Sequence, residues 1–493
     1  MCQSRLIRPV LGVVSAAALL AGCTVSVTGQ GVSPLVDPYH VADLPAQNGP
    51  SGIKPDAPAP TGTVTNTDNG DDDKLVLLAV NDVADFWQQN FDSAGFTGGF
   101  APVTKLVSYD AKDPGSPEVC GAPTYQEVNA FYCPPGRLLA WDRAVMVPTG
   151  RKYFGDISIA GLIGHEYGHA IQRMAHLVDP DSTPTIVLEQ QADCFSGAYM
   201  YSVAAGRSER FQMSTGDGLN HVRAGLITIR DPTLGPEDTE MEQDGHGTAL
   251  DRVGAFQIGF SSGPAACGKI DMDNIRQRRN GLPMELSDAP ENPRRGTDAK
   301  INKKLLTVLV DRLNELLKPQ HPPTLTTDGA NCSGTQSSSK SPAVYCPSDN
   351  TVAVDVAALA KLGKPRDEED NRRLLSGDNT ALSIVVSRYM MALQHDRGVK
   401  LDNGTAALRT ACLTAVAERR MVGPEGTDPG DQQSPPLTLT AGDMDKAVAG
   451  LLTNGYVASD VNGQTVPAGF TRIDAFRSGL STGMDDGCYN RYS

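Results

Sequence analysis

The chain has 493 residues, more than one hydrophobic core usually serves, so two globular domains with extensions are expected. Its content of 40% hydrophobic and 20% charged residues is ordinary for a soluble protein. The formal net charge of −15 argues against a nucleic-acid partner, because binding to phosphates requires concentrated lysine and arginine.

The N-terminus has the features of a lipoprotein signal peptide. Arg5 and Arg8 precede an apolar run over residues 10–20, which is too short to span a bilayer comfortably. A buried or anchoring helix is the alternative, but small residues lead directly to Cys23, as in the bacterial lipobox. We therefore expect residues 1–22 to be removed, Cys23 to be acylated, and the chain to be held by this lipid alone at the extracytoplasmic face of the cell membrane.

The next segment, residues 23–74, is rich in proline, glycine, asparagine, aspartate and threonine and has no apolar periodicity. This composition predicts a disordered tether. Apolar residues then recur at helical spacing from Leu75 to Phe91. The folded part of the chain is therefore expected to begin near Leu75.

The sequence HEYGH at residues 165–169 is an HExxH motif. Residues four apart lie on one face of a helix, so His165 and His169 can bind one ion while Glu166 stands beside a bound water molecule. The alternative is an amphipathic helix with two unrelated histidines, but the chain has only 8 His, so a chance match is rare. The motif predicts the zinc site of a metalloprotease.

A catalytic zinc site needs a third protein ligand, and Glu189 is the candidate. Glu189 follows His169 by twenty residues, and Asp193 lies one helical turn further along on the same face. This spacing suits a ligand and a second carboxylate that hydrogen-bonds to a ligand. Thr183 and Pro184 predict that a second helix starts here, so two helices would bracket the ion.

Three separated blocks of sequence carry a family resemblance. They are GHEYGHAIQ at residues 164–172, LEQQADCFS at 188–196, and GHGT at 245–248, followed by Arg252 and Val253. The blocks resemble the bacterial putative neutral zinc metallopeptidase family, which is of the glutamate-zincin type. The layout of the whole chain further resembles the actinobacterial lipoprotein peptidases called LpqM.

The resemblance implies a helix-rich, zincin-like α+β fold and a role for each matching residue. The implied zinc ligands are His165, His169 and Glu189. Asp193 would hydrogen-bond to a ligand histidine, and Glu166 would be the general base. His246, in the third block, is the candidate for stabilising the oxyanion, with a structural histidine in a glycine turn as the alternative. Other candidates for that role are His221, Tyr153 and Tyr199.

The chain also resembles itself. The sequence AFYCP at residues 130–134 matches AVYCP at 343–347, and RVGAF at 252–256 matches RIDAF at 472–476. Similarity at long range in a fixed order predicts a duplicated domain. We therefore expect a zinc metallopeptidase domain over residues 75–285 and a second copy of it over residues 286–493.

The second copy is expected to be degenerate and non-catalytic. Alignment of the two copies places Ser387 and Met391 at the positions of the ligand histidines and Arg388 at that of Glu166. Ala407 takes the position of Glu189. One zinc ion per chain is therefore expected, with structural support as the simplest role for the second copy.

The repeat also orders the cysteines. Eight of the 10 Cys remain after cleavage of the signal peptide and acylation of Cys23. If both copies carry the same bridges, the pairs are Cys120 with Cys133, Cys194 with Cys267, Cys332 with Cys346, and Cys412 with Cys488. Oxidised pairs are the expectation for an exported chain, and a thiol at the zinc site is the alternative for Cys194.

These observations together predict a lipid-anchored zinc metallopeptidase that hydrolyses protein or peptide substrates by zinc-activated water, with Glu166 as general base. One alternative is a non-peptidase zinc hydrolase that acts on amides of the cell envelope. Another is a binding or assembly lipoprotein in which the zinc is structural. A fourth, closed ligand position at the metal would favour the structural role.

Overall fold

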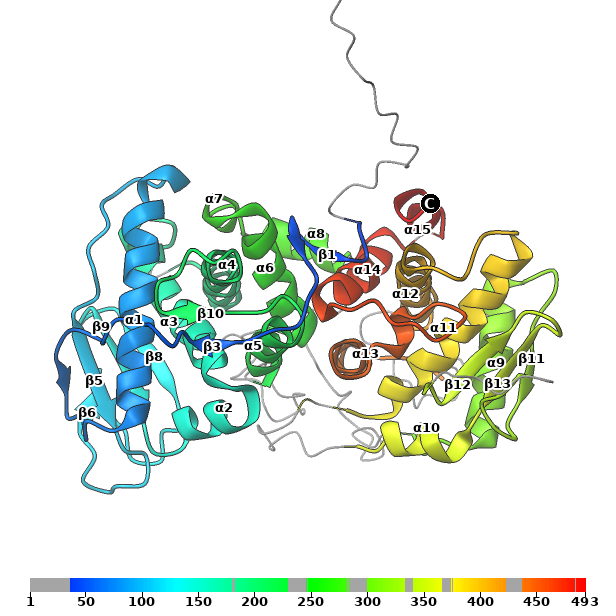
Figure 1. The fold of residues 1–493 in the computed structure, drawn as a ribbon, viewed down its shortest axis with the longest axis horizontal. Helices are drawn as coiled ribbons and strands as arrows, with labels where there is room; N and C mark the ends of the chain where they lie inside the picture. The colour runs from blue at the N-terminus through cyan, green and yellow to red at the C-terminus, as the bar shows by residue number, and fades with distance from the viewer. Residues whose placement is uncertain are drawn as a thin grey trace, which may run out of the picture. The chain divides into compact units, whose positions relative to one another are not determined.

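The structure is a computed structural model. It describes residues 36–179, 182–228, 245, 247–280, 282, 299–332, 340–365, 374, 376–422, 437–483 and 485–493. Cys23, the predicted signal peptide and His246 lie outside these ranges. The fold is α+β, as the sequence predicts, with long helices and small sheets (Figure 1). Among the described helices, none combines the length and the apolar character that crossing a bilayer requires.

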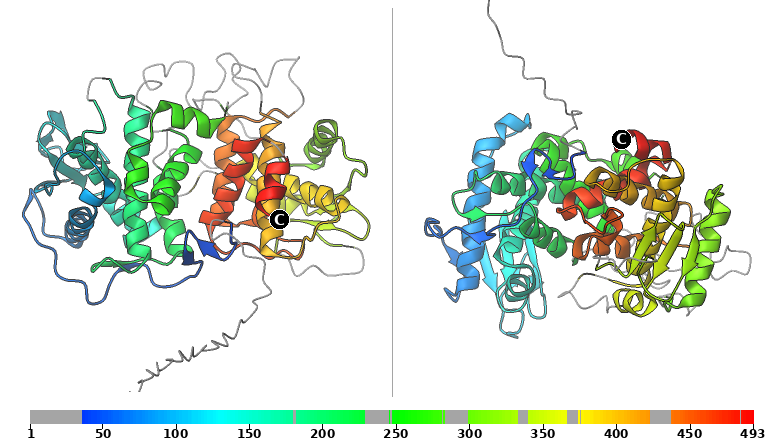
Figure 2. Two further views of the ribbon diagram at one scale, coloured as in Figure 1. Left: turned by 90° about the horizontal axis from the view of Figure 1, so that it is seen from above. Right: turned by 45° about the vertical axis from the view of Figure 1, so that its right-hand side comes forward.

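The first half of the chain combines one larger sheet with a group of helices (Figures 1 and 2). Its helices of eight or more residues are α1 (Asp71–Asn90), α2 (Met146–Phe154), α3 (Asp156–Met174), α4 (Thr185–Ala204), α5 (Asp217–Thr228), α6 (Ala249–Ser262) and α8 (Met272–Arg279). The sheet contains β4 (Val64–Thr65), β5 (Lys105–Tyr109), β9 (Leu138–Asp142) and β8 (Ala130–Cys133), in that order. Strand β5 is parallel to its neighbours β4 and β9, whereas β8 is antiparallel to β9 and forms an edge.

The prediction that residues 23–74 form a disordered tether is wrong for the described part, residues 36–74. Strand β3 (Gly52–Ile53) pairs with β10 (Phe211–Gln212), and β4 pairs with β5. Helix α1 begins at Asp71 rather than near Leu75. Three aspartates occupy its first turn, where negative charge is favourable, and buried Asp73 accepts a hydrogen bond from Trp141 Nε1 at 2.7 Å. Backbone pairing and polar contacts therefore order a segment that has few apolar residues.

Helices α3, α4 and α6 pack side by side in the core of the first half. Glycine makes this close packing possible at two positions. A Cβ atom on Gly168 would lie 3.0 Å from the Cα atom of Ala192, and one on Gly259 would lie 1.7 Å from the carbonyl oxygen of Cys194. Gly168 of α3 thus allows α4, which carries Glu189, to approach α3, and Gly259 of α6 allows α4 to approach α6.

The second half has its own sheet and its own group of helices. Its helices of eight or more residues are α9 (Lys303–Leu317), α11 (Asp378–Asp396), α12 (Gly404–Arg419), α13 (Ala441–Thr453) and α14 (Gly469–Thr482). The shorter helices are α10 (Val356–Leu362) and α15 (Asp485–Arg491). Its sheet has the order β11 (Thr324–Thr326), β13 (Thr351–Val354) and β12 (Ala343–Cys346). Strand β13 is parallel to β11 and antiparallel to β12, just as β9 is parallel to β5 and antiparallel to β8.

Four disulfides connect the elements, and they are the pairs that the repeat predicts. They join Cys120 to Cys133, Cys194 to Cys267, Cys332 to Cys346, and Cys412 to Cys488. Cys194 is therefore in a disulfide and is no candidate for a zinc thiolate. The predicted domain boundary between residues 285 and 286 lies outside the described residues.

Candidate metal centre

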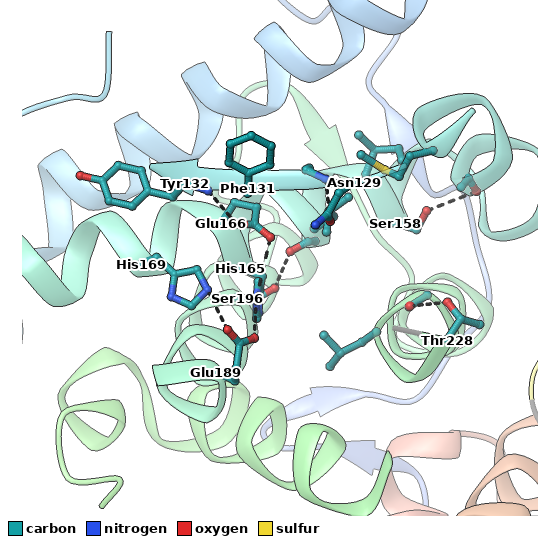
Figure 3. A pocket seen from close by; sticks show the side chains of 18 of the residues that line it. Asn129, Phe131, Tyr132, Ser158, His165, Glu166, His169, Glu189, Ser196 and Thr228 are labelled. Carbon is teal, nitrogen blue, oxygen red and sulfur yellow. Dashed lines mark hydrogen bonds and ion pairs between the residues drawn. The ribbon is translucent and has the colours of Figure 1, made fainter. Parts of the chain in front are cut away.

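Helices α3 and α4 bring His165, His169 and Glu189 together (Figure 3). The Nε2 atom of His165 lies 3.2 Å from Glu189 Oε2, and that of His169 lies 3.4 Å from Glu189 Oε1. One possible ligand atom from each of the three residues lies within 4.8 Å of the others. In the part of the chain that the structure describes, no other group of histidine, cysteine and acidic side chains meets this criterion.

The donor set fits zinc in both type and spacing. Four tetrahedral ligand atoms at the usual zinc bond lengths are about 3.3 Å apart, close to the two distances between histidine nitrogens and Glu189. Two imidazole nitrogens and one carboxylate oxygen are also a frequent protein ligand set of catalytic zinc. The three residues can therefore hold one zinc ion.

Both histidines are oriented by hydrogen bonds at their Nδ1 atoms. His165 Nδ1 donates to Asp193 Oδ1 at 2.7 Å, and His169 Nδ1 lies 3.1 Å from Gln172 Oε1. A proton on Nδ1 leaves Nε2 free to bind a metal ion. Arg252 in α6 donates to both oxygens of Asp193, at 3.0 and 2.8 Å. The sequence indicated Asp193. Gln172 lies one helical turn after His169 on α3, whereas the position of Arg252 follows only from the packing of α6 against α4.

The electrostatics favour a cation at this centre. Burial alone would lower the pKa of His165, but the carboxylates of Asp193 and Glu189 raise it to about 10. Burial would raise the pKa of Glu189, whereas His169 and His165 hold it well below its usual range. The two carboxylates thus stabilise positive charge at the two imidazoles. The same negative electrostatic potential attracts a divalent cation to this centre.

Glu166 points toward the centre from α3 but is held on its other side by the sheet (Figure 3). Its Oε2 atom accepts a hydrogen bond from the backbone N–H of Tyr132 in β8, at 3.1 Å. Burial raises the pKa of Glu166, and Glu189 adds to this effect, while the two histidines oppose it. A raised pKa makes a carboxylate a stronger base near neutral pH.

A cavity of about 830 Å³ opens over the metal centre. Strand β8, helices α2, α3 and α5, and the start of α4 contribute its walls. Its lining combines the charged side chains of the metal centre with hydroxyl groups and apolar side chains. The apolar side chains include Val145, Met146, Phe154, Ile159, Leu162, Val222 and Leu226.

The structure does not place any of the described candidates for stabilising the oxyanion at the cavity. His246 lies outside the described residues. Tyr199 is buried, and its hydroxyl donates to Asp82 at 2.7 Å in the core, away from the metal centre. Neither His221 nor Tyr153 is among the residues that line the cavity.

The corresponding place in the second half holds different chemistry. Ser387 is the tenth residue of α11, as His165 is of α3. Buried Arg388 donates from Nε to the carbonyl oxygen of Ala343 in β12, at 2.9 Å, and from Nη2 to that of Tyr456 at 3.1 Å. Its guanidinium thus bonds to the strand that corresponds to β8, which contacts Glu166 in the first half.

A helix with an HExxH motif and a glutamate from the next helix define the class of zinc-dependent metallopeptidase centres. The comparison with protein families gives the particular group. The sequence model of the family described as putative neutral zinc metallopeptidase matches residues 14–270, just over half of the chain, and the chain belongs to this family. The comparisons with curated proteins and with solved structures find no match.

Proposed function

We propose that this protein is a zinc metallopeptidase that hydrolyses peptide bonds in the cavity over His165, His169 and Glu189. The observation that carries this proposal is the position of Glu166. Its carboxylate is buried between the metal centre and the edge strand β8, where both a water molecule and a peptide can reach it. A structural zinc site would need neither a base nor an open cavity.

The chain's own residues have separate tasks in the proposed reaction. Zinc, when bound, supplies a Lewis acid that polarises a carbonyl group and makes water more acidic. Glu166 accepts a proton from the attacking water on one carboxylate oxygen and then delivers it to the leaving amine. Asp193 holds His165 in the orientation that binds the ion, and Arg252 holds Asp193.

The geometry of β8 favours an extended peptide as the substrate. This strand is at the edge of its sheet, and residues 129–132 line the cavity. An edge strand can form backbone hydrogen bonds with a peptide that is added as a further strand. The apolar side chains in the cavity lining would then contact an apolar side chain of that peptide.

The location at the extracytoplasmic membrane face is part of the same proposal. Four disulfides are typical of exported chains, which supports a place outside the cytoplasm. The lipid anchor rests on the lipobox at Cys23. Cys23→Ser should move the protein from the membrane fraction to the soluble fraction, and membrane retention of that variant would contradict lipid anchoring.

The function is tested with Glu166→Gln. This substitution removes the base but no ligand, so we expect about one zinc per chain by elemental analysis and loss of peptide hydrolysis by a factor of at least roughly 100. Glu118→Gln, which changes an exposed glutamate elsewhere, is the control and should hydrolyse peptides normally.

Two results would contradict parts of this proposal. Loss of zinc from Glu166→Gln would make Glu166 a ligand rather than a base. Cleavage of cell-wall peptides but not of proteins or linear peptides by the native enzyme would instead favour the envelope amide hydrolase.

A further inference from the structure

Helix α5 lies between the catalytic cavity and the second half of the chain. Val222, Gly225 and Leu226 line the cavity. Ala224 and Ile227 belong instead to the hydrophobic core formed largely by the second half. The same helix is thus a wall of the proposed active site and a part of the neighbouring core.

The second half reaches α5 through the start of α14. Phe470 packs in the hydrophobic core of the first half, together with Leu219 and Val222 of α5. The carbonyl oxygen of Phe470 accepts a hydrogen bond from Gln257 Nε2 in α6 at 3.0 Å. The backbone of Phe470 is therefore tied to the first half, and its ring is inserted there.

Arg223 of α5 is the side chain that meets this ring. Its guanidinium carbon lies 5.2 Å from the centroid of the Phe470 ring. The side chain is fully buried, and none of its three nitrogens has a hydrogen-bond partner. Burial, together with the nearby Arg477, lowers the pKa of Arg223 to about 9.

A buried cation without a hydrogen-bond partner is costly, so its two attractive interactions, with the charge of Asp474 and with the face of the Phe470 ring, matter. The face of an aromatic ring attracts a guanidinium, and more strongly when both are desolvated. This attraction depends on the ring lying over the cation, so it favours one position of α5 relative to α14. Contact between the helices is also close at Gly469, where a Cβ atom would lie 2.4 Å from Asn220 Oδ1.

We propose that Phe470, in the second half, is a positioning residue for substrate binding in the first. Through its contact with Arg223 it holds α5 in place, and with it Val222 and Leu226 in the wall of the cavity. The second half thus helps to bind the peptide without touching it. This inference rests on the proposed peptidase function and adds a task for the half that lacks the zinc ligands.

The test compares Phe470→Leu with Phe476→Leu. Both phenylalanines lie in α14, but Phe476 is fully buried in the core of the second half. Both variants should lose similar stability, whereas only Phe470→Leu should raise KM, by about tenfold, with kcat and zinc content nearly unchanged. Phe470→Tyr keeps the ring face and should retain the native KM.

Two further measurements separate positioning from a general loss of stability. Arg223→Ala should raise KM by a similar factor, and the double variant with Phe470→Leu should be no worse than either single variant, because both remove one contact. Multiplied effects in the double variant would overturn the inference, as would an equal KM increase in Phe476→Leu.

A readout that needs no turnover distinguishes this inference from the proposed function. Amide hydrogen exchange should accelerate in α5 but not in α3 of Phe470→Leu. Unchanged exchange in α5 would overturn the inference even if the enzyme is active. Absence of zinc-dependent hydrolysis in the native protein, with α5 loosened in the variant, would instead contradict the proposed function alone.

Discussion

At the scale of single residues, the metal centre depends on a chain of buried hydrogen bonds that runs from Arg252 through Asp193 to His165. Asp193 is fully buried, and both of its oxygens accept hydrogen bonds from the guanidinium of Arg252. Such a bidentate pair is rigid as well as strong. The orientation of His165 is therefore set by α6 and α4 together, not by the HExxH helix alone.

Asp193→Asn tests this arrangement. We expect zinc affinity to fall by about 10- to 100-fold, because the amide is a weaker acceptor for His165 Nδ1–H and leaves Arg252 without its counter-charge. Competition with a chromophoric chelator measures the affinity. The matched control is Asp251→Asn, since Asp251, which lies in α6, is likewise a buried aspartate that pairs with an arginine, Arg279. An equal loss of zinc affinity in the control would indicate general destabilisation.

The sequence indicates residues whose roles depend on local spacing. His165, Glu166 and His169 share one helix, and the interval from Glu189 to Asp193 is one helical turn, so their arrangement follows from helix geometry. The N–H of Tyr132 and the guanidinium of Arg252 reach the centre from other elements. Their roles depend on how β8 and α6 pack against α3 and α4, which no local pattern encodes.

At the scale of elements, the helices were more predictable than the segments between them. Helix α4 begins at Thr185, directly after Thr183 and Pro184, where the sequence predicts its start. The strands within residues 40–65 carry no such signal. Two of them, β3 and β4, are ordered by partners further along the chain: Gly52 pairs with Gln212, and Val64 pairs with Leu106. Composition alone therefore predicted disorder where long-range backbone pairing produces order.

Helix α12 contains a buried carboxyl group that should make stability depend on pH. Burial raises the pKa of Glu418 to about 8, although hydrogen bonds from Ser383 and Asn379 oppose this. A folded-state pKa above the unfolded value of 4.5 means that the group favours folding fully below pH 4.5. This contribution is lost as the pH rises through 8.

Glu418→Gln should remove that dependence. At pH 8 the variant should be more stable than the native protein by roughly 3 kcal/mol, whereas at pH 5 the two should be nearly equal. Denaturant unfolding at both pH values measures the difference, with Glu315→Gln on the exposed side of α9 as the control. The same stability difference at both pH values would show that Glu418 titrates normally.

At the scale of the whole molecule, two halves with one order of elements differ at the metal centre. Sheets with the same pattern of parallel and antiparallel neighbours precede helices α3 and α11, each of which has 19 residues. A duplicated domain, which the internal sequence similarity predicts, would have this agreement between its copies. In the second half, Arg388 takes the position in the helix that Glu166 has in the first half. Its guanidinium is hydrogen-bonded to the carbonyl oxygens of Ala343 and Tyr456, so it cannot act as a base.

The halves also share their hydrophobic cores, which predicts that they unfold together. Three residues of the first half pack in the hydrophobic core of the second half: Phe154, Ala249 and Val253. Conversely, Ala468 and Phe470 of the second half pack in the core of the first half. Separation of the halves would expose these side chains to water, at a free-energy cost of about 1.5–3 kcal/mol for each large one.

Scanning calorimetry of the full chain should therefore give one unfolding transition. Removal of zinc should lower the midpoint temperature of this transition but should not divide it into two transitions. The reason is that a bound ligand stabilises the whole cooperative unit that contains its site. A chelator that shifts one transition and leaves a second at its original temperature would show two independent domains.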